Sequence, residues 1–397
     1  MTGPTRILLV AQGLGPAGAE RQVAHLTAGL ASQGHEVTLL CIGQAPSVDR
    51  DGIERAGARF VSLGAMSPRD RARKLPSMIA LARRADAVVC SSWDATFWGR
   101  VSAIVARRPV IAIEHAVYRS LQTSMSGKPR ARWIALHNRL LDPFTYATVA
   151  CAGAQLPVLR SEGVAERKLV LIPNGVPVAE LRAAAGDTEA ADGGRPGLGI
   201  DRDGLVIVHV ARLTALKNQR QTLATARRLR AEGLDVHVLL LGDGEDRAAL
   251  EAECEAEPWV HLLGARDRVA PFLGLADLAV LPSLAEAMPM VVVEALAVGV
   301  PLVASDVGDV GAILRRTGAG IAVPAGDGDA FTAACGRLLR DPGERARLAA
   351  CAREAGEGFD ASEMSRSYGA LLQSAVAGRS PLEGARHRRT SVLGKPS

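Results

Sequence analysis

Residues 278–306 read LAVLPSLAEAMPMVVVEALAVGVPLVASD. The apolar runs LAVLPS (278–283) and PLVASD (301–306) are typical of buried strands, and Pro289 suits the first turn of a helix between them. A strand, a helix and a second strand in this order predict a parallel βαβ unit. The same alternation precedes this stretch, with strands predicted at LVIVHVA (205–211), DVHVLLLG (235–242) and WVHLLG (259–264).

The front half of the chain repeats the pattern. The segment AERQVAHLTAGLASQG (19–34) places Val23, Leu26 and Leu30 on one helical face, and Gly34 can end this helix. Strands are predicted at residues 6–12, 36–43, 85–92, 109–115, 146–153 and 168–175. We therefore predict an α/β protein with two doubly wound, Rossmann-like parallel sheets.

Domain boundaries follow from changes in composition. The stretch 183–204, rich in Ala, Gly and Asp, lacks periodicity, so residues 179–204 are interpreted as a linker or surface loop. It would separate a first domain, residues 1–178, from a second, residues 205–361. The polar, basic tail 378–397 is predicted to be disordered.

Composition narrows the class of protein. Of 397 residues 48% are hydrophobic but only 3% aromatic, and such an aliphatic core suits parallel sheets covered by helices. The six cysteines are scattered singly, which favours reduced thiols over disulfides or zinc sites. With no evident signal peptide and no apolar run of about 18 residues, we expect a cytoplasmic protein.

Charge is distributed unevenly. Residues 1–175 carry 22 Lys and Arg against 12 Asp and Glu, a net +10, and the remainder carries −5. The basic half suits an anionic lipid surface, an acidic acceptor or nucleic acid, or else reflects an Arg-rich composition. In KPRARWIALHNRLL (128–141) arginines alternate with apolar residues, so this helix either lies on anionic lipid or packs its apolar side on the sheet.

Gly13-Leu14-Gly15-Pro16-Ala17-Gly18 fits the dinucleotide pattern GxGxxG. That interpretation requires an acid at the end of the second strand, which instead ends in Ile42-Gly43. We favour a glycine loop that lets backbone approach a phosphate or sugar, with a plain turn as the alternative.

Charged residues follow two strands of the back half. Arg212 and Lys217, in a loop entering a helix, can hold a pyrophosphate through a bidentate guanidinium and a point charge. Glu286 lies before the helix whose first turn Pro289 suits, and Glu294 lies about one turn inside it. Because the flanks of Glu294 are almost wholly apolar, its carboxylate is expensive to bury unless something bonds it, which favours a ligand over surface charge pairing.

At this point the chain resembles glycosyltransferase family 4, the large retaining family with the GT-B fold. PSLAEAMPMVVVEALAVGVPLVASDVG is similar to the E-x7-E region of the family and VARLTALKN to its diphosphate clamp. LIPNGV (171–176) and GLGPAGAERQVAHLTAGLASQGHEV are similar to its Ile-Pro-Asn-Gly-Val turn and its amino-terminal loop and helix. The motifs occur in order over residues 6–375.

The resemblance implies two Rossmann-like domains facing a cleft, with a last helix (about 362–376) that crosses back onto the first. It also implies roles for single residues. Glu294 would hold the ribose, His115 would face the reaction centre, and the loop of Arg266 would lie against the nucleobase. Arg212 and Lys217 would neutralise the donor diphosphate, and Gly15 would allow the first loop to approach that diphosphate. The transferred sugar would contact Glu286 and the backbone of Ala287, Met288, Pro289 and Met290.

The predicted function is retaining transfer from a nucleotide-diphosphate sugar to a glycan or a lipid-linked precursor of cell-surface polysaccharide, with peripheral contact to an anionic membrane. We expect no cofactor, no nucleic-acid partner and no metal, since Asp201-Arg-Asp203 lies in a polar turn and Asp327-Gly-Asp329 where a helix cap is expected. Without the resemblance, a lone histidine such as His115 is usually structural. The alternatives are a nucleotide-sugar epimerase and a non-catalytic nucleotide-sugar-binding protein.

Overall fold

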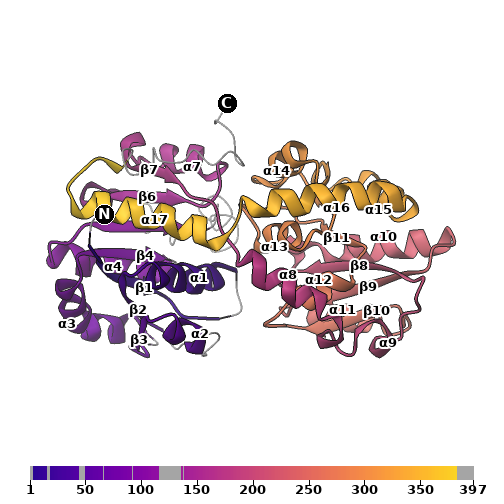
Figure 1. The fold of residues 1–397 in the computed structure, drawn as a ribbon, viewed down its shortest axis with the longest axis horizontal. Helices are drawn as coiled ribbons and strands as arrows, with labels where there is room; N and C mark the ends of the chain where they lie inside the picture. The colour runs from indigo at the N-terminus through magenta and orange to yellow at the C-terminus, as the bar shows by residue number, and fades with distance from the viewer. Residues whose placement is uncertain are drawn as a thin grey trace. The chain divides into compact units, whose positions relative to one another are not determined.

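The computed structural model describes residues 3–15, 18–43, 50–65, 67–91, 93–115, 136 and 138–381. The chain divides into two compact units, residues 1–175 with 361–397 and residues 176–360, and Figure 1 shows a parallel sheet with flanking helices in each. The predicted basic helix 128–141 lies mostly, and the tail 382–397 wholly, outside the described residues.

The first unit holds a seven-stranded sheet in the order β3-β2-β1-β4-β5-β6-β7, in which every neighbouring pair is parallel. Its strands are β1 (Arg6–Ala11), β2 (Glu36–Cys41), β3 (Arg59–Ser62), β4 (Ala87–Ser91), β5 (Val110–Glu114), β6 (Ala147–Ala150) and β7 (Leu169–Leu171). The described helices are α1 (Gly18–Ser32), α2 (Arg50–Arg55), α3 (Pro68–Arg84), α4 (Trp93–Val105), α7 (Gln155–Ser161) and α17 (Ala361–Val376).

Helices cover both faces of this sheet because its strands are buried on both sides. One face packs under α1 and α17, where Leu26 and Leu30 meet the interior residues of β1 and β2. The other face packs under α3 and α4. The final helix α17 belongs to this unit, since its Tyr368 and Leu371 join the same core as α1.

The second unit holds a six-stranded parallel sheet in the order β10-β9-β8-β11-β12-β13. Its strands are β8 (Leu205–Val210), β9 (Val236–Leu241), β10 (Val260–Gly264), β11 (Leu278–Leu281), β12 (Leu302–Ser305) and β13 (Gly320–Val323). Its helices are α8 (Val178–Gly186), α9 (Gly194–Gly197), α10 (Gln219–Ala231), α11 (Arg247–Glu253), α12 (Ala270–Leu275), α13 (Met290–Val298), α14 (Val310–Thr317), α15 (Gly328–Arg340) and α16 (Pro342–Glu357).

The strand order fixes where a ligand can bind in each unit. In both sheets the order reverses beside the first strand, between β1 and β4 and between β8 and β11. Ligands of open parallel sheets bind beyond the carboxyl ends of the strands at such a point. The loops that follow β8 and β11 are the ones that carry the residues singled out in the sequence.

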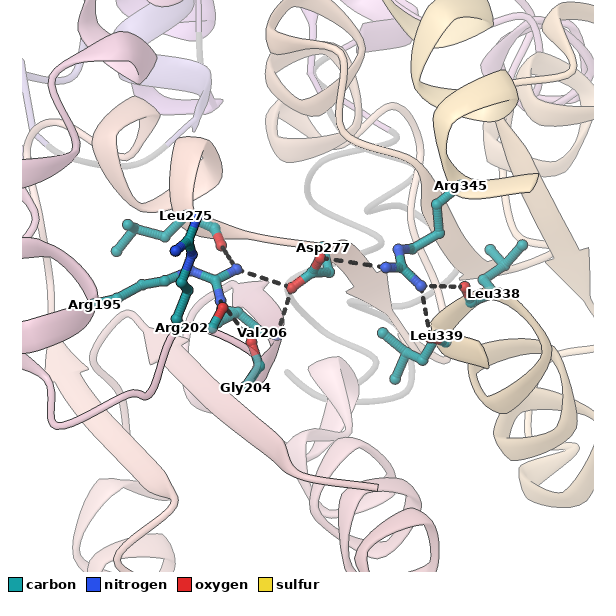
Figure 2. Close-up of polar contacts among 9 residues, drawn as sticks. All are labelled: Arg195, Arg202, Gly204, Val206, Leu275, Asp277, Leu338, Leu339 and Arg345. Carbon is teal, nitrogen blue, oxygen red and sulfur yellow. Dashed lines mark hydrogen bonds and ion pairs between the residues drawn. The ribbon is translucent and has the colours of Figure 1, made fainter. Parts of the chain in front are cut away.

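Residues 179–204, predicted as a linker, are instead an ordered part of the second unit. Helix α8 packs on α12 and α13. Beyond it, the Arg195 guanidinium donates to the carbonyl of Gly204 (2.6 Å) and to the carboxylate of Asp277 (3.1 Å), as Figure 2 shows. The prediction was wrong because a segment without apolar periodicity can still be held by side-chain-to-backbone hydrogen bonds.

Candidate active site

The loop after β8 is shaped by the neighbouring loop after β9. The Leu213 amide donates to the Asp243 carbonyl (3.0 Å), and the Asp246 amide donates back to the Leu213 carbonyl (3.1 Å). Gly242 (φ 142°) allows this approach, since a Cβ there would lie 1.9 Å from the Ala211 carbonyl oxygen. The loop presents the exposed side chain of Arg212, which makes no ion pair with any residue that the structure describes.

Lys217 and Glu286 meet although they lie 69 residues apart. The Lys217 ammonium donates to the Glu286 carboxylate in an ion pair whose side chains are 22% and 9% exposed. The loops that carry them are tied by a backbone hydrogen bond from Leu284 to Leu216 (2.9 Å). The structure therefore brings together a cation after β8 and an acid after β11, on the two sides of the point where the strand order reverses.

The entry into α13 is fixed by a glycine that the sequence analysis did not single out. Gly308 has a φ of 55°, and a Cβ there would lie 2.3 Å from the Ala287 carbonyl and 2.6 Å from that of Glu286. The next amide, of Asp309, donates to the Ala287 carbonyl (3.0 Å). The turn after β12 thus contacts the backbone of Glu286 and Ala287.

Helix α13 carries the remaining residues of the predicted donor site. Pro289 is its N-cap, Met290 its first residue, and both Ala287 and Met288 are buried in the loop before it. Every residue of α13 is buried, including Glu294, which is 2% exposed. A carboxylate at such a position is expected to hold a polar group.

Arg266 is engaged within its own unit. Its guanidinium donates to the Asp192 carboxylate (2.5 Å) and to the Leu263 carbonyl (3.0 Å), and it lies over the ring of Phe272 (5.5 Å). The structure does not place this side chain with Lys217 and Glu286. The backbone of its loop does follow the carboxyl end of β10, as predicted.

His115 follows β5 in the first unit, at the carboxyl edge of that sheet. The residue is partly buried, with Nε2 2.7 Å from the Ser91 hydroxyl and Nδ1 3.7 Å from the Cys151 sulfur. Burial lowers the pKa of His115 to about 4, so the ring is neutral near pH 7. Sequence reasoning missed Ser91, although its place at the end of β4 is the kind of position where site residues occur.

Gly15, in the loop after β1, is buried against an acid. A Cβ at this position would lie 2.2 Å from the Glu20 carboxylate, so a larger residue would require that side chain to move. Pro16 and Ala17 lie outside the described residues. An approach of this loop to donor phosphates stays a prediction.

Neither of the two Asp-x-Asp sequences forms part of the Lys217–Glu286 site. Asp327 caps α15 by accepting a hydrogen bond from the Ala330 amide (2.9 Å), as predicted. Among the residues with described positions, no three His, Cys, Asp or Glu side chains are grouped as metal ligands.

Two family models match the chain, Glycosyltransferase Family 4 over residues 16–180 and Glycosyl transferases group 1 over residues 204–341. The putative glycosyltransferase EpsF of Bacillus subtilis is 29% identical over 76% of this chain and 79% of its own length. A UDP-Gal:alpha-D-GlcNAc-diphosphoundecaprenol alpha-1,3-galactosyltransferase of Escherichia coli is 29% identical over 44% of this chain and 46% of its own.

The solved structure of HepE from Anabaena in complex with UDP-glucose is similar in fold. It superposes with a TM-score of 0.79 at 19% identity, over 93% of this chain and all of HepE. At that identity the likeness concerns the fold alone, which is GT-B. With both family models matched in order and the fold in agreement, the chain belongs to glycosyltransferase family 4, the group 1 glycosyltransferases, and is a hexosyl- or related glycosyltransferase.

Proposed function

We propose that the second unit binds a nucleotide-diphosphate sugar and that the enzyme transfers the sugar with retention of its anomeric configuration. The observation that carries this is the ion pair of Lys217 with Glu286 at the point where the strand order reverses, with exposed Arg212 in the same loop as Lys217. Two cations suit a diphosphate, and a carboxylate beside them suits sugar hydroxyls. The buried Glu294 would hold the ribose.

The proposed reaction needs no dedicated protein base. As the bond to the diphosphate breaks, positive charge builds on the sugar ring and negative charge on the leaving group. Arg212 and Lys217 stabilise the leaving group, and a donor phosphate oxygen takes the proton of the acceptor hydroxyl. No cofactor or metal is part of this proposal.

The experiment is a thermal-shift series on the full chain with uridine, UDP and UDP-sugars, and with the matching ADP and GDP compounds. Diphosphates should raise Tm and the bare nucleosides should not, because only the former engage Arg212 and Lys217. The best donor is then incubated with saccharide and polyprenyl-diphosphate-linked acceptors, and the anomer of the product is read by NMR. A product of inverted configuration would discard retention, and a C-epimer of the donor formed without acceptor would identify an epimerase.

We further propose that the acceptor is lipid-linked and that the first unit contacts an anionic membrane surface. Leu136, Leu140 and Phe144 are spaced four residues apart and are 46%, 58% and 63% exposed. The Lys168 ammonium lies against the same segment, donating to the carbonyl of Asp142 (2.6 Å). Exposed apolar side chains beside cations suit the interface of an anionic bilayer. None of the described helices is long and apolar enough to span a bilayer.

Vesicle sedimentation tests the membrane contact. The full chain should pellet with phosphatidylglycerol vesicles more than with phosphatidylcholine vesicles, and added salt should reduce the difference. Leu140→Ser with Phe144→Ser should lower binding at least several-fold, whereas Val376→Ser, at an equally exposed apolar site on α17, should not. Equal binding by both variants would overturn the assignment of this surface.

A further inference from the structure

The ring of His115 is held by two buried groups from the neighbouring strands. Ser91 ends β4 and is 0% exposed, while Cys151 directly follows β6 and is 2% exposed. The Ser91 hydroxyl lies 2.7 Å from Nε2, and the Cys151 sulfur lies 3.7 Å from Nδ1. Both groups are buried, so each ring nitrogen of His115 lies within contact of a fixed protein group.

The two contacts differ in length. The 2.7 Å contact lies within hydrogen-bond distance for a hydroxyl that donates to Nε2, and such a donor leaves the ring proton on Nδ1, facing the sulfur of Cys151. Burial raises the pKa of Cys151 to about 12, so that residue remains a thiol, a weak acceptor.

Gln155, the first residue of α7, fixes the main chain around the same ring. Its side-chain oxygen accepts the amides of Cys151 (2.7 Å) and Ala152 (2.9 Å), and its nitrogen donates to the Glu114 carbonyl (3.0 Å). One side chain thus ties the end of β5, which carries His115, to the end of β6, which carries Cys151. The backbone cannot shift to compensate for a lost ring contact without breaking these bonds.

We propose that Ser91 is a positioning residue of the transfer reaction. Its hydroxyl holds His115 in the Nδ1–H tautomer, and that N–H exchanges the sulfur of Cys151 for an oxygen of the bound acceptor. The exchange costs little because a thiol sulfur is a poor acceptor and an oxygen a good one. This inference rests on the proposed transfer reaction and adds to it that His115 contacts the acceptor.

Nitrogen-15 NMR of the full chain reads the tautomer directly. Long-range proton–nitrogen correlations of histidine-labelled protein, assigned with His115→Gln, should show Nδ1 protonated and Nε2 bare. Ser91→Ala should convert this signal to a mixture of tautomers, and Ser102→Ala should not, although Ser102 is an equally buried hydroxyl that donates to the Gly99 carbonyl (2.8 Å). A wild-type ring protonated on Nε2, or a signal unchanged in Ser91→Ala, would overturn the proposal.

Kinetics provides the second readout. A hydroxyl donating to Nε2 favours the neutral ring, so its loss should raise the pKa of His115 and move the acid limb of the pH–activity profile toward neutral pH. The loss of one hydrogen bond shifts a pKa by about one unit, so turnover of Ser91→Ala should fall roughly 2-fold near pH 5, change little near pH 8, and recover in Ser91→Thr. If the threonine variant does not fold, Cys151→Ser tests the proposal instead. A serine hydroxyl accepts from Nδ1–H more strongly than a thiol does, so the substrate oxygen should displace it less readily and KM should rise. An unchanged KM would count against the exchange.

His115→Ala separates this inference from the proposed function. Full turnover in that variant would remove His115 from the site, whatever Ser91 does. Loss of turnover in His115→Ala together with wild-type kinetics and tautomer in Ser91→Ala would sink the inference and leave the proposed function standing.

Discussion

The Lys217 ammonium, which we assign to the donor diphosphate, is paired with the carboxylate of Glu286, which we assign to the transferred sugar. Without ligand, each charge thus neutralises the other. A diphosphate must compete with Glu286 for the lysine, so removing the acid and removing the cation should have opposite effects on nucleotide binding.

Glu286→Gln should bind a nucleoside diphosphate at least as tightly as the wild type, because Lys217 is released, yet it should turn over the nucleotide sugar about 100-fold more slowly. Lys217→Ala should lose both affinity and turnover. Calorimetry with the diphosphate and initial rates with the sugar nucleotide measure the two effects. Arg228→Ala is the control, since Arg228 is an exposed cation of the same unit paired with Asp329 (2.8 Å). Parallel losses of affinity in Glu286→Gln and Lys217→Ala would contradict the competition.

Gly308→Ala should damage the same site without touching a charged residue. A methyl group there would push against the carbonyls of Ala287 and Glu286, at 2.3 and 2.6 Å, and so displace the loop that holds the sugar. Gly326→Ala is the matched control, because Gly326 also has a positive φ (82°) but has no atom within 4 Å of its Cβ position. We expect turnover to fall at least 10-fold in the first variant only, while both lose about 1 kcal/mol of stability from backbone strain. Equal activities would show that the loop does not depend on this turn.

The sequence predicted the parallel sheets well where the strands are wholly buried. Nearly continuous apolar runs such as RILLVA and LVIVHV indicate strands buried on both faces, and they form β1 and β8. Strands β3 and β13 were not predicted, because they lie at the sheet edges, are partly exposed and are only four residues long.

The sequence predicted the charged residues of the site, because they lie in loops that follow strands. Arg212, Lys217 and Glu286 stand in loops after strands, and the structure pairs two of them. What the sequence could not indicate are supports made by long-range contacts. The hydroxyl of Ser91 acts on a ring 24 residues away, and Gly308 faces the backbone of a loop from a different strand. The hydrogen bond of Arg266 to Asp192 could not be predicted either, because Asp192 lies in the segment that was predicted to be a linker.

His209 should make the second unit sensitive to acid. It is buried in β8 with Nδ1 2.9 Å from the Thr222 hydroxyl, and burial, followed by the charge of Lys217, lowers its pKa to about 3 from 6.5. Because the folded pKa lies below the unfolded one, its contribution is complete above about pH 6.5 and is lost as the pH falls, by about 1.4 kcal/mol per pH unit.

His209→Gln removes this titration, so the slope of unfolding free energy against pH should decrease by that amount between about pH 6 and pH 4.5. His25 and His115, whose pKa values burial also lowers to about 4, remain in the variant and keep the rest of the slope. Urea denaturation at several pH values measures it. A slope identical to that of the wild type would show that His209 is not protonated on unfolding in this range.

Asp277 should be a stability determinant with no part in catalysis. It precedes β11, at the opposite end of that strand from Glu286. Its carboxylate accepts hydrogen bonds from the Val206 amide (2.9 Å) and the Arg195 guanidinium (3.1 Å), and the Arg345 guanidinium lies 3.7 Å away (Figure 2). Asp277→Ala leaves two guanidinium groups and one amide without this acceptor, so it should cost about 2–4 kcal/mol, and Asp277→Asn, which keeps one acceptor oxygen, should cost less.

Activity per folded molecule should stay unchanged in both Asp277 variants when it is assayed well below their Tm. Asp329→Ala is the matched control, since Asp329 is 94% exposed in its ion pair with Arg228 and its loss should change the unfolding free energy by no more than about 0.5 kcal/mol. Urea unfolding curves rank the three variants. A stable Asp277→Ala would mean that residues 179–204 are held to the second unit without this carboxylate, and a stable but inactive one would place Asp277 in the catalytic machinery.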